Sequence, residues 1–409
     1  MRLLHTSDWH LGQHFMGKSR QAEHQALIDW LLTIVEEHAV DAVLIAGDLF
    51  DTGTPPSYAR ELYNQLVLRL DQSGVGLLLL GGNHDSVAVL GESRALLARL
   101  GAVVVPGADD PESQLQILTH RDGSAACIVC AIPFIRPRDV LQSRAGQSAD
   151  DKQLGLQQAI AAHYQSVYAQ ALARREALRS ETGIRLPIIA TGHLATVGAS
   201  SSESVREIYV GSLEAFPANA FPPADYIALG HIHRPQQVGG LAHIRYSGSP
   251  LPLSFDEARQ AKEMLLVDLT ADGLQGITAL PVPCFQALVA IETTLAGLPA
   301  AIGAAAAQAL PGKPVWLEIT INEDDYLADL PARVQSVCEG WPVEVLRIRK
   351  ARSKAAAVNA EKPGEMLDEL TPDEVFARRL AQETPDAEVH AALNERFRQI
   401  VAGLTEEEA

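Results

Sequence analysis

Cysteine is scarce in this sequence, with four residues in 409. So few cysteines in a chain of this length form no disulfide framework, which favours the reducing cytoplasm. One spacing, Cys127-x-x-Cys130, is typical of half a zinc site, but no second pair follows it. The apolar residues around it, from Ala125 to Ile132, instead predict a buried strand.

Long apolar runs are missing as well. The most apolar-looking stretch, residues 299–310, is mostly alanine and too short to span a bilayer, so it predicts a packed helix. Near the N-terminus, His5, Asp8 and His10 interrupt the chain before any hydrophobic signal core can form. We therefore expect a cytoplasmic protein that makes no contact with a membrane.

The chain also lacks an excess of positive charge, since its formal net charge is −18. A protein that coats DNA through general electrostatic attraction is normally basic. The composition thus argues against broad electrostatic binding of DNA by this chain alone. It leaves room for a nuclease whose metal ions meet the phosphate locally, or whose partner supplies a basic surface.

What is present is an alternation of strand and helix patterns, which predicts an α/β fold. Helices are expected over residues 19–40, 57–72, from 87 to near 100, and 152–181. Strands are expected over residues 2–6, 41–46, 75–80, 126–132, 186–191, 225–229, 243–247 and 264–269.

The length predicts more than one domain, and the pattern changes near Pro281-Val282-Pro283. Residues 1–275 form the expected main domain, and residues 285–350 a small α+β domain. A polar stretch with glycine and proline at 351–370 is typical of a linker. Two helices with an apolar face are expected in residues 371–409, where Thr371-Pro372 gives a helix start.

Five short polar patches carry the chemistry, and four of them directly follow a predicted apolar strand. The carboxyl ends of strands in an open α/β sheet meet in one crevice, so these patches are expected to converge. The patches are Asp8-Trp9-His10, Gly47-Asp48, Gly82-Asn83-His84-Asp85, Gly192-His193 and Gly230-His231-Ile232-His233.

The residue types in these patches suit two divalent metal ions. Asp and Asn supply hard oxygen ligands and His supplies nitrogen, a mixture that suits Mn²⁺, Fe²⁺, Zn²⁺ or Mg²⁺ rather than a thiolate site. A carboxylate can bridge two metals about 3.5–4 Å apart, the spacing that clamps a phosphoryl group. Each patch alone is more often a turn or a helix cap. Their order, each at a strand end, makes coincidence improbable.

With these residues in hand, the sequence resembles the calcineurin-like metallophosphoesterase superfamily, through its D-x-H, G-D, G-N-H-D, G-H and G-H-x-H patches. More narrowly, it is similar to the SbcD family of bacterial nuclease subunits. The segments HTSDWHLGQ, GDLFDTGTPPSYAR, GGNHDS, GHIHRPQ and YSGSPLPLSFDE carry that likeness. It is specific from Met1 to about residue 275 and weaker beyond. The implied fold is a metallophosphoesterase sandwich with a small capping domain and a C-terminal helical pair.

The resemblance also implies roles for the residues of the five patches. Two divalent ions, expected as Mn²⁺, would assist hydrolysis of a phosphodiester. His84 would contact the scissile phosphate and assist the leaving oxygen, with Asp85 orienting its ring. At position 51, where relatives often carry a second catalytic histidine, this chain has Asp51, so the role of that position stays open. The implied ligands are Asp8, His10, Asp48 and His233 for one metal and Asp48, Asn83, His193 and His231 for the other, with Asp48 bridging.

The function implied is that of a DNA nuclease subunit, a double-strand exonuclease and single-strand or hairpin endonuclease, active in DNA repair and recombination at the nucleoid. The expected partners are DNA and an SbcC-like ATPase that docks on residues 371–409, with a homodimer inside a heterotetramer. Helices at 57–73 and 87–100 are the expected dimer contacts, and the basic run at 347–354 is a candidate phosphate contact. Two alternatives remain: a small-molecule phosphodiesterase with the same metals, or a catalytically silent scaffold for DNA ends.

Overall fold

A computed structural model describes residues 1–108, 111–141, 149–205, 215–322 and 329–350, with Leu393, Arg396 and Phe397 beyond them. It divides into two units, residues 1–350 and 351–409. The expected linker at 351–370 lies outside the described residues. So do the expected C-terminal helices at 371–409, apart from the three isolated residues, which are helical.

The first sheet has six strands and joins the beginning of the chain to residues 263–281. Four neighbouring strands run parallel and reach one edge of the sheet, and the other two continue it with antiparallel pairing to the opposite edge. The strand order is β14 (Gly273–Pro281), β13 (Glu263–Thr270), β1 (Arg2–Thr6), β4 (Ala42–Ala46), β5 (Gly76–Leu80) and β6 (Ala102–Val105). The domain boundary expected at 275 therefore falls inside β14.

The second sheet also has six strands, with parallel strands in the centre and an antiparallel strand at each edge. Its order is β11 (Gln236–Val238), β12 (Leu241–Tyr246), β10 (Tyr226–Gly230), β9 (Ile188–His193), β8 (Ala125–Cys130) and β7 (Leu115–Thr119). Central strands of this kind are buried on both faces, which explains their nearly continuous apolar sequences.

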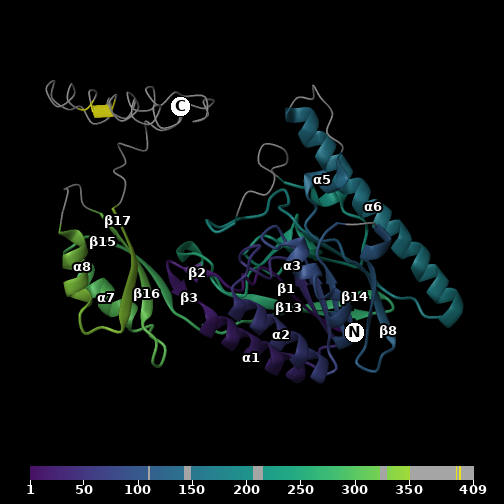
Figure 1. Ribbon diagram of the computed structural model, residues 1–409, viewed down its shortest axis with the longest axis horizontal. Coiled ribbons are helices and arrows are strands. Elements are labelled where there is room, and N and C mark those ends of the chain that lie inside the picture. Colours follow the sequence, from purple (N-terminus) through teal and green to yellow (C-terminus); the bar gives the residue numbers. More distant parts are fainter. Residues whose placement is uncertain are drawn as a thin grey trace. The chain divides into compact units, whose positions relative to one another are not determined.

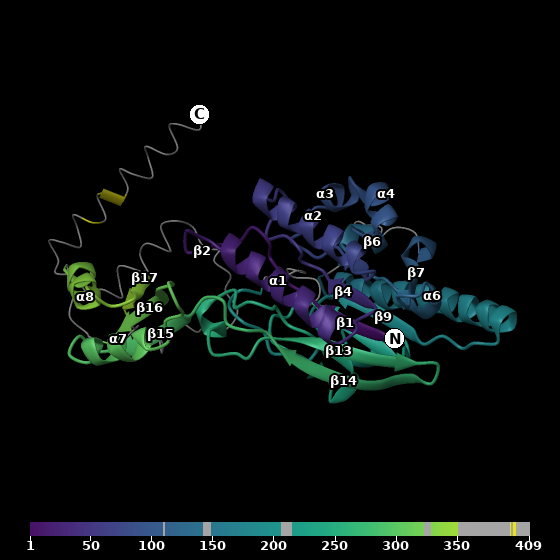
Figure 2. The same cartoon turned by 90° about the horizontal axis from the view of Figure 1, so that it is seen from below.

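The two sheets pack face to face and helices cover their outer faces. In β4, Ala42, Leu44 and Ala46 belong to the core between the sheets, while Val43 and Ile45 pack toward helices α1 (Gln21–Glu37) and α2 (Ser57–Gln72). These two helices lie side by side (Figure 1 and Figure 2). The long helix α6 (Ala149–Thr182) covers the second sheet.

Strand β8 contains the cysteine pair. Cys127 lies in the core between the sheets, and Cys130 lies in the core under α6, so the two thiols are on opposite faces of the strand. Burial raises the pKa of each thiol to about 12. The prediction of a buried strand is confirmed.

Several elements differ from the sequence-based expectation. The helix expected to end near residue 100 is broken into α3 (Val87–Gly91), α4 (Arg94–Leu97) and the 3-10 turn η1 (Ala98–Leu100). The first piece ends at Gly91, a poor helix former, and Ser93 precedes the second piece as its N-cap. The sequence reading also missed β6, β7, β11 and β14, which are short or lie at sheet edges. Short elements complete this part: β2 (His14–Phe15), β3 (Lys18–Ser19), η2 (Pro111–Gln114), α5 (Pro137–Val140), η3 (Ala218–Ala220) and η4 (Phe255–Glu257).

The small domain, green in Figure 1, has its own core of apolar side chains. Its three strands are all parallel and are joined by two crossover helices. The elements are β15 (Leu288–Thr293), α7 (Leu298–Ala306), β16 (Val315–Ile321), α8 (Leu330–Cys338) and β17 (Val343–Lys350). The β2–β3 hairpin reaches this domain, where the ring of Phe15 stacks on Trp316 with 5.8 Å between centroids.

Candidate metal centre

The candidate ligands lie at the carboxyl ends of neighbouring parallel strands in both sheets. In the first sheet, Asp8 and His10 follow β1, Asp48 follows β4, and Asn83 follows β5. In the second sheet, His193 ends β9, while His231 and His233 follow β10. The structure thus brings together all seven residues predicted as ligands from the sequence.

Glycines beside these residues let the loops approach closely. A Cβ atom at Gly82 would lie 2.1 Å from Asp48 Oδ1, and one at Gly47 would lie 2.2 Å from His193 Nδ1. Gly47 also has a φ of 91°, which an L side chain rarely adopts. Gly82 therefore allows two loops of the first sheet to meet, and Gly47 allows a loop of the first sheet to meet the end of β9 in the second.

The backbone at the candidate ligands is strained. Asp8, His10, Asp48 and His231 have φ angles of 55°, 48°, 49° and 94°. Of the six residues other than glycine with positive φ in the described part of the chain, these are four. Conformations of this kind cost about 1–3 kcal/mol each and cluster at functional sites, where the surrounding structure enforces them.

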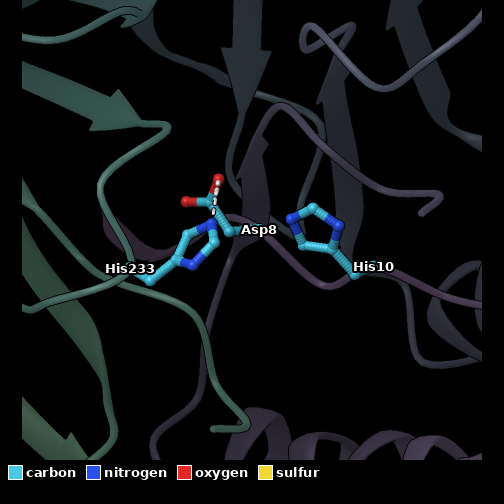
Figure 3. Close-up of side chains that lie close together, drawn as sticks. All are labelled: Asp8, His10 and His233. Atoms are coloured by element: carbon cyan, nitrogen blue, oxygen red, sulfur yellow. Dashed lines mark ion pairs between the residues drawn. The ribbon is translucent and has the colours of Figure 1, made fainter. Parts of the chain in front are cut away.

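Asp8, His10 and His233 form one group of side chains (Figure 3). Their nearest ligand atoms all lie within 4.8 Å of one another, and all three residues are buried. Nε2 of His233 is 4.0 Å from Asp8 Oδ1. Nε2 of His10 is buried without a hydrogen-bond partner among the described residues. Three ligand atoms therefore converge on a space with a nitrogen whose lone pair is unused.

Asn83, His193 and His231 form a second group on the other side of Asp48. Asn83 Oδ1 is 2.9 Å from His193 Nε2 and 3.1 Å from His231 Nδ1. Two atoms bound at right angles to one ion, each at about 2.1 Å, would lie about 3 Å apart. The spacing of these ligand atoms therefore fits a shared metal ion.

The hydrogen bonds of His193 strengthen this conclusion. Its Nδ1–H donates to the carbonyl oxygen of Ala46 at 2.9 Å. In a neutral ring, Nε2 then carries a lone pair that faces two acceptors, Asn83 Oδ1 and Asp48 Oδ2, the latter at 3.2 Å. Three acceptors that face one another in a buried site require a positive charge, which a bound metal ion or a proton on Nε2 of His193 would supply.

Asp48 lies between the two groups, as a bridging ligand would. Its Oδ2 is 3.2 Å from His193 Nε2 and 3.7 Å from His10 Nε2. Its Oδ1 accepts a hydrogen bond of 2.8 Å from the backbone N–H of His84. One oxygen is thus held by the protein backbone while the other faces both groups.

The site concentrates negative charge away from water. Burial lowers the pKa of His193, but the charge of Asp48 outweighs burial and raises that pKa to about 9. Burial also lowers the pKa of His10, but the hydrogen bond to Asp51 and the charge of Asp48 outweigh it and raise that pKa. Both shifts favour positive charge at this position, as expected where a cation binds.

Two carboxylates outside the ligand set hold histidines in place. Asp51 Oδ1 accepts from His10 Nδ1–H at 3.0 Å, and Glu257 Oε1 accepts from His233 Nδ1–H at 3.1 Å. In both rings Nε2 is thereby directed to the site. Sequence reasoning assigned no role to Glu257, because nothing in the spacing of residues 233–257 indicates that they meet.

His84 lies beside His10, with 4.6 Å between the ring centroids. Its Nδ1–H donates to the backbone carbonyl of Asp51 at 2.7 Å. His84, His10 and Asp48 form a third group whose ligand atoms lie within 4.8 Å of one another. His84 is half-buried, like the candidate ligand Asn83, whereas the other six candidate ligands are buried.

Asp85 does not take the place expected for it from the sequence. Its carboxylate accepts from the backbone N–H groups of Gly82, Leu49 and Phe50 at 2.9–3.1 Å, and the bond on Nδ1 of His84 goes to Asp51 instead. Burial and the charge of Asp48 raise the pKa of Asp85 to about 6 despite these bonds. Asp85 therefore joins the loops after β4 and β5 rather than orienting His84.

Comparison with known proteins agrees with the fold and the site. The family profile of calcineurin-like phosphoesterases matches residues 1–235. A second profile, described as the type 5 capsule protein repressor C-terminal domain, matches residues 284–384. The fold and site thus define a metallophosphoesterase of the calcineurin-like class, a class that binds divalent metal ions.

Individual relatives show to which family within this class the chain belongs. The chain is 50% identical to the SbcD subunit of nuclease SbcCD from Escherichia coli K12, over 97% of each chain. It is 33% identical to the protein of the same name from Rhodobacter capsulatus, over 92% of this chain and 94% of the relative. The Bacillus subtilis protein is 32% identical over 66% of each chain. The chain belongs to the SbcD family of SbcCD nuclease subunits.

Proposed function

We propose that this chain is the metal-dependent nuclease subunit of an SbcCD-type complex and hydrolyses phosphodiester bonds in DNA. The observation that carries the proposal is the meeting of seven Asp, Asn and His side chains from five strand ends. The relatives that are named nucleases supply the substrate class.

The proposed ligands divide into two sets that share Asp48. Two divalent ions, for which Mn²⁺ is our proposal, would activate water and neutralise charge on the phosphate when bound. One set consists of Asp8, His10, Asp48 and His233, and the other of Asp48, Asn83, His193 and His231.

His84 is the proposed catalytic residue outside the ligand sets. Because its Nδ1–H is bonded to the Asp51 carbonyl, Nε2 is the atom that can donate a proton or a hydrogen bond. We propose that it assists the departing oxygen of the cleaved diester. Asp85 supports this step only indirectly, by holding the loop that carries His84.

The name of the relatives refers to an SbcCD nuclease, which supports an assembly with an SbcC-like partner. We further propose that this partner is an ATPase. We propose that the complex acts in the cytoplasm, at the nucleoid, in repair and recombination of DNA. We propose residues 371–409 as the docking segment for that ATPase. A homodimer inside the complex would use α2 and α4, where Leu68 is 46% and Leu96 is 65% exposed. Among the described residues, no helix has the length and apolar character needed to cross a membrane.

A nuclease assay tests the proposed function. The purified chain is incubated with Mn²⁺ and a linear duplex, a DNA hairpin or a nitrophenyl phosphodiester, with and without the ATPase. Cleavage of DNA, abolished by EDTA and restored by Mn²⁺, is the expected result. Cleavage of the nitrophenyl ester alone would favour a small-molecule phosphodiesterase, and no cleavage of any substrate would favour a silent scaffold.

A further inference from the structure

The loop that follows β8 reaches the edge of the candidate site. The backbone N–H of Phe134 donates to the carbonyl oxygen of Gly81 at 2.8 Å, and that of Ile132 donates to Thr191 Oγ1 at 2.7 Å. Gly81 directly follows β5, and Thr191 belongs to β9. Both strands carry candidate ligands at their carboxyl ends, so the loop is fixed beside these ligands although it supplies none of them.

Arg136 ends this loop and contacts the residue that directly follows His84. Its Nη2 donates to the carbonyl oxygen of Asp85 at 3.2 Å, and its guanidinium carbon lies 5.5 Å from the centroid of the Phe134 ring. The centroid of that ring is in turn 6.4 Å from the centroid of the His193 ring. The guanidinium therefore lies at the border of the site, between the loop of the proposed acid and a ring that packs near a candidate ligand.

The sequence around Arg136 holds this residue outside helix α5. Pro137 begins the helix and favours an extended conformation in the residue before it, which Arg136 adopts with φ −77° and ψ 144°. Asp139, the nearest acid along the chain, accepts from the backbone N–H of Arg136 at 3.0 Å, and its other oxygen lies 3.8 Å from Arg138 Nε. The carboxylate of Asp139 thus fixes the start of the helix and pairs with a different arginine.

The charge of Arg136 has no carboxylate partner among the described residues. One of the five N–H groups of its guanidinium donates to the carbonyl oxygen of Asp85, and none of them joins an ion pair in that part of the chain. The residue is half-buried, so part of it is open to solvent. Because a net charge of −18 gives the chain no general attraction for DNA, a phosphate near the site has to be met by a local cation of this kind.

Arg20 shows how an arginine is bonded in this chain when its role is structural. It is fully buried, and its Nε and Nη2 donate to the two carboxylate oxygens of Glu23 at 2.9 and 2.6 Å. Its Nη1 donates to Gln13 Oε1 at 2.8 Å and to the carbonyl oxygen of Pro252 at 2.6 Å. The protein itself thus neutralises Arg20, whereas Arg136 keeps a charge and donors for an anion that comes from outside the chain.

We propose that Arg136 binds a phosphate of the DNA strand next to the one that is cleaved. A guanidinium is always charged, and its planar fork of N–H groups matches the oxygens of a phosphate. In the proposed function the candidate ligands and His84 surround the cleaved phosphate, and Arg136 contacts none of these side chains in the described part of the chain. A neighbouring phosphate is therefore the group it meets. This inference rests on the proposed function and adds to it a contact that only a polymeric substrate can make.

Two variants and a control separate this contact from a structural role. Arg136→Gln removes the charge but keeps an N–H group for the carbonyl oxygen of Asp85, whereas Arg136→Lys keeps the charge but loses the planar fork. The control, Arg179→Gln, removes one charge from an exposed side chain at the end of α6, shortly before β9 begins at the sheet edge opposite the ligands. Thermal unfolding and calorimetric titration with Mn²⁺ should give wild-type values for all three proteins.

Equilibrium binding measures the contact without turnover. The full chain is titrated into a labelled single-stranded oligonucleotide in EDTA, over a series of salt concentrations. Arg136→Gln should bind about 10-fold more weakly, because it loses a hydrogen bond to a charged group. The slope of log K against log salt concentration should become less steep by about 0.7, the value for one phosphate contact on a single strand. Arg136→Lys should keep the slope and recover part of the affinity, and Arg179→Gln should match the wild type in both.

Cleavage locates the phosphate that Arg136 binds. At saturating Mn²⁺, kcat/KM is measured for an oligonucleotide and for a thymidine nitrophenyl diester, whose only phosphate is the one that is cleaved. Arg136→Gln should lower kcat/KM about 10-fold for the oligonucleotide and leave the value for the nitrophenyl diester unchanged. A neutral methylphosphonate next to the cleaved position should lower kcat/KM of the wild type by a similar factor, with no further loss in Arg136→Gln.

The outcomes that would overturn the inference are distinct. An unchanged salt slope in Arg136→Gln, even with weaker binding, would make Arg136 a structural residue. An equal loss of kcat/KM for both substrates would place Arg136 on the cleaved phosphate, and additive losses with a methylphosphonate at every position would exclude a neighbouring one. If the wild-type chain cleaves neither substrate, the proposed function fails, while the salt dependence of binding still decides whether Arg136 contacts a phosphate of DNA.

Discussion

An aspartate lies close to a histidine at each end of strand β4, but the surroundings of the two aspartates differ. At its beginning, Asp41 accepts from the backbone N–H of Arg2 and pairs with His120 near the surface. At its end, Asp48 is buried among histidines, in a left-handed conformation. Aspartate–histidine pairs alone therefore do not define the site. Burial, strained backbone and convergence of acceptors from neighbouring strands do.

The largest effect is expected where both ligand sets depend on one residue. Asp48→Asn removes the charge that faces His10 and His193, so both proposed metal sites weaken together. Loss of one electrostatic stabiliser costs about 10²–10³-fold in kcat, and loss of a shared ligand should exceed the upper value. Metal analysis and DNA cleavage measure it. Two bound ions with near-normal activity would disprove the bridging role.

His84→Ala should reduce the rate without removing metal. General acid assistance is worth about 10²–10⁴-fold, and that loss is expected in kcat for DNA at saturating Mn²⁺. Metal content, measured by elemental analysis after desalting, should stay at the wild-type value. Loss of an ion would instead make His84 a ligand, in keeping with its nearness to His10 and Asp48.

Gly82→Ala tests the close approach of the loops. The added Cβ would meet Asp48 Oδ1 at 2.1 Å, so the carboxylate must move. A displacement of about 1 Å at a catalytic group can cost about 10²-fold. Gly74→Ala is the control, because its Cβ would meet no atom within 4 Å although its φ is positive. Equal loss of activity in both variants would show that the contact with Asp48 is not the cause.

The smallest effect is expected at the other end of β4. Asp41→Asn keeps a side-chain oxygen for the N–H of Arg2, and the lost ion pair with His120 is partly exposed. Partly exposed pairs contribute about 0–1 kcal/mol to the free energy of unfolding. Denaturant unfolding should show a change within that range and the activity should be unaltered. A large loss of activity would mean that the two ends of the strand are coupled.

The sequence predicted the elements that place the ligands, because strand ends and polar patches coincide. Strands β1, β4, β5, β9 and β10 were expected close to where they lie, and the ligand candidates follow from them. The roles of Asp51 and Asp85 could not be predicted, because they depend on turns whose backbone angles no residue pattern encodes. Glu257 was missed because it meets His233 through a loop without periodicity.

The distribution of the ligands over two sheets has a consequence for how the enzyme comes into being. Asp8 is made first and His233 last, 225 residues later, and Glu257, which supports His233, follows after that. Domains fold during synthesis as their segments emerge, so a nascent chain holds part of the first proposed ligand set long before that set is complete. An incomplete chain therefore lacks the complete centre. A fragment that stops before residue 233 lacks both the proposed ligand His233 and the carboxylate that holds it.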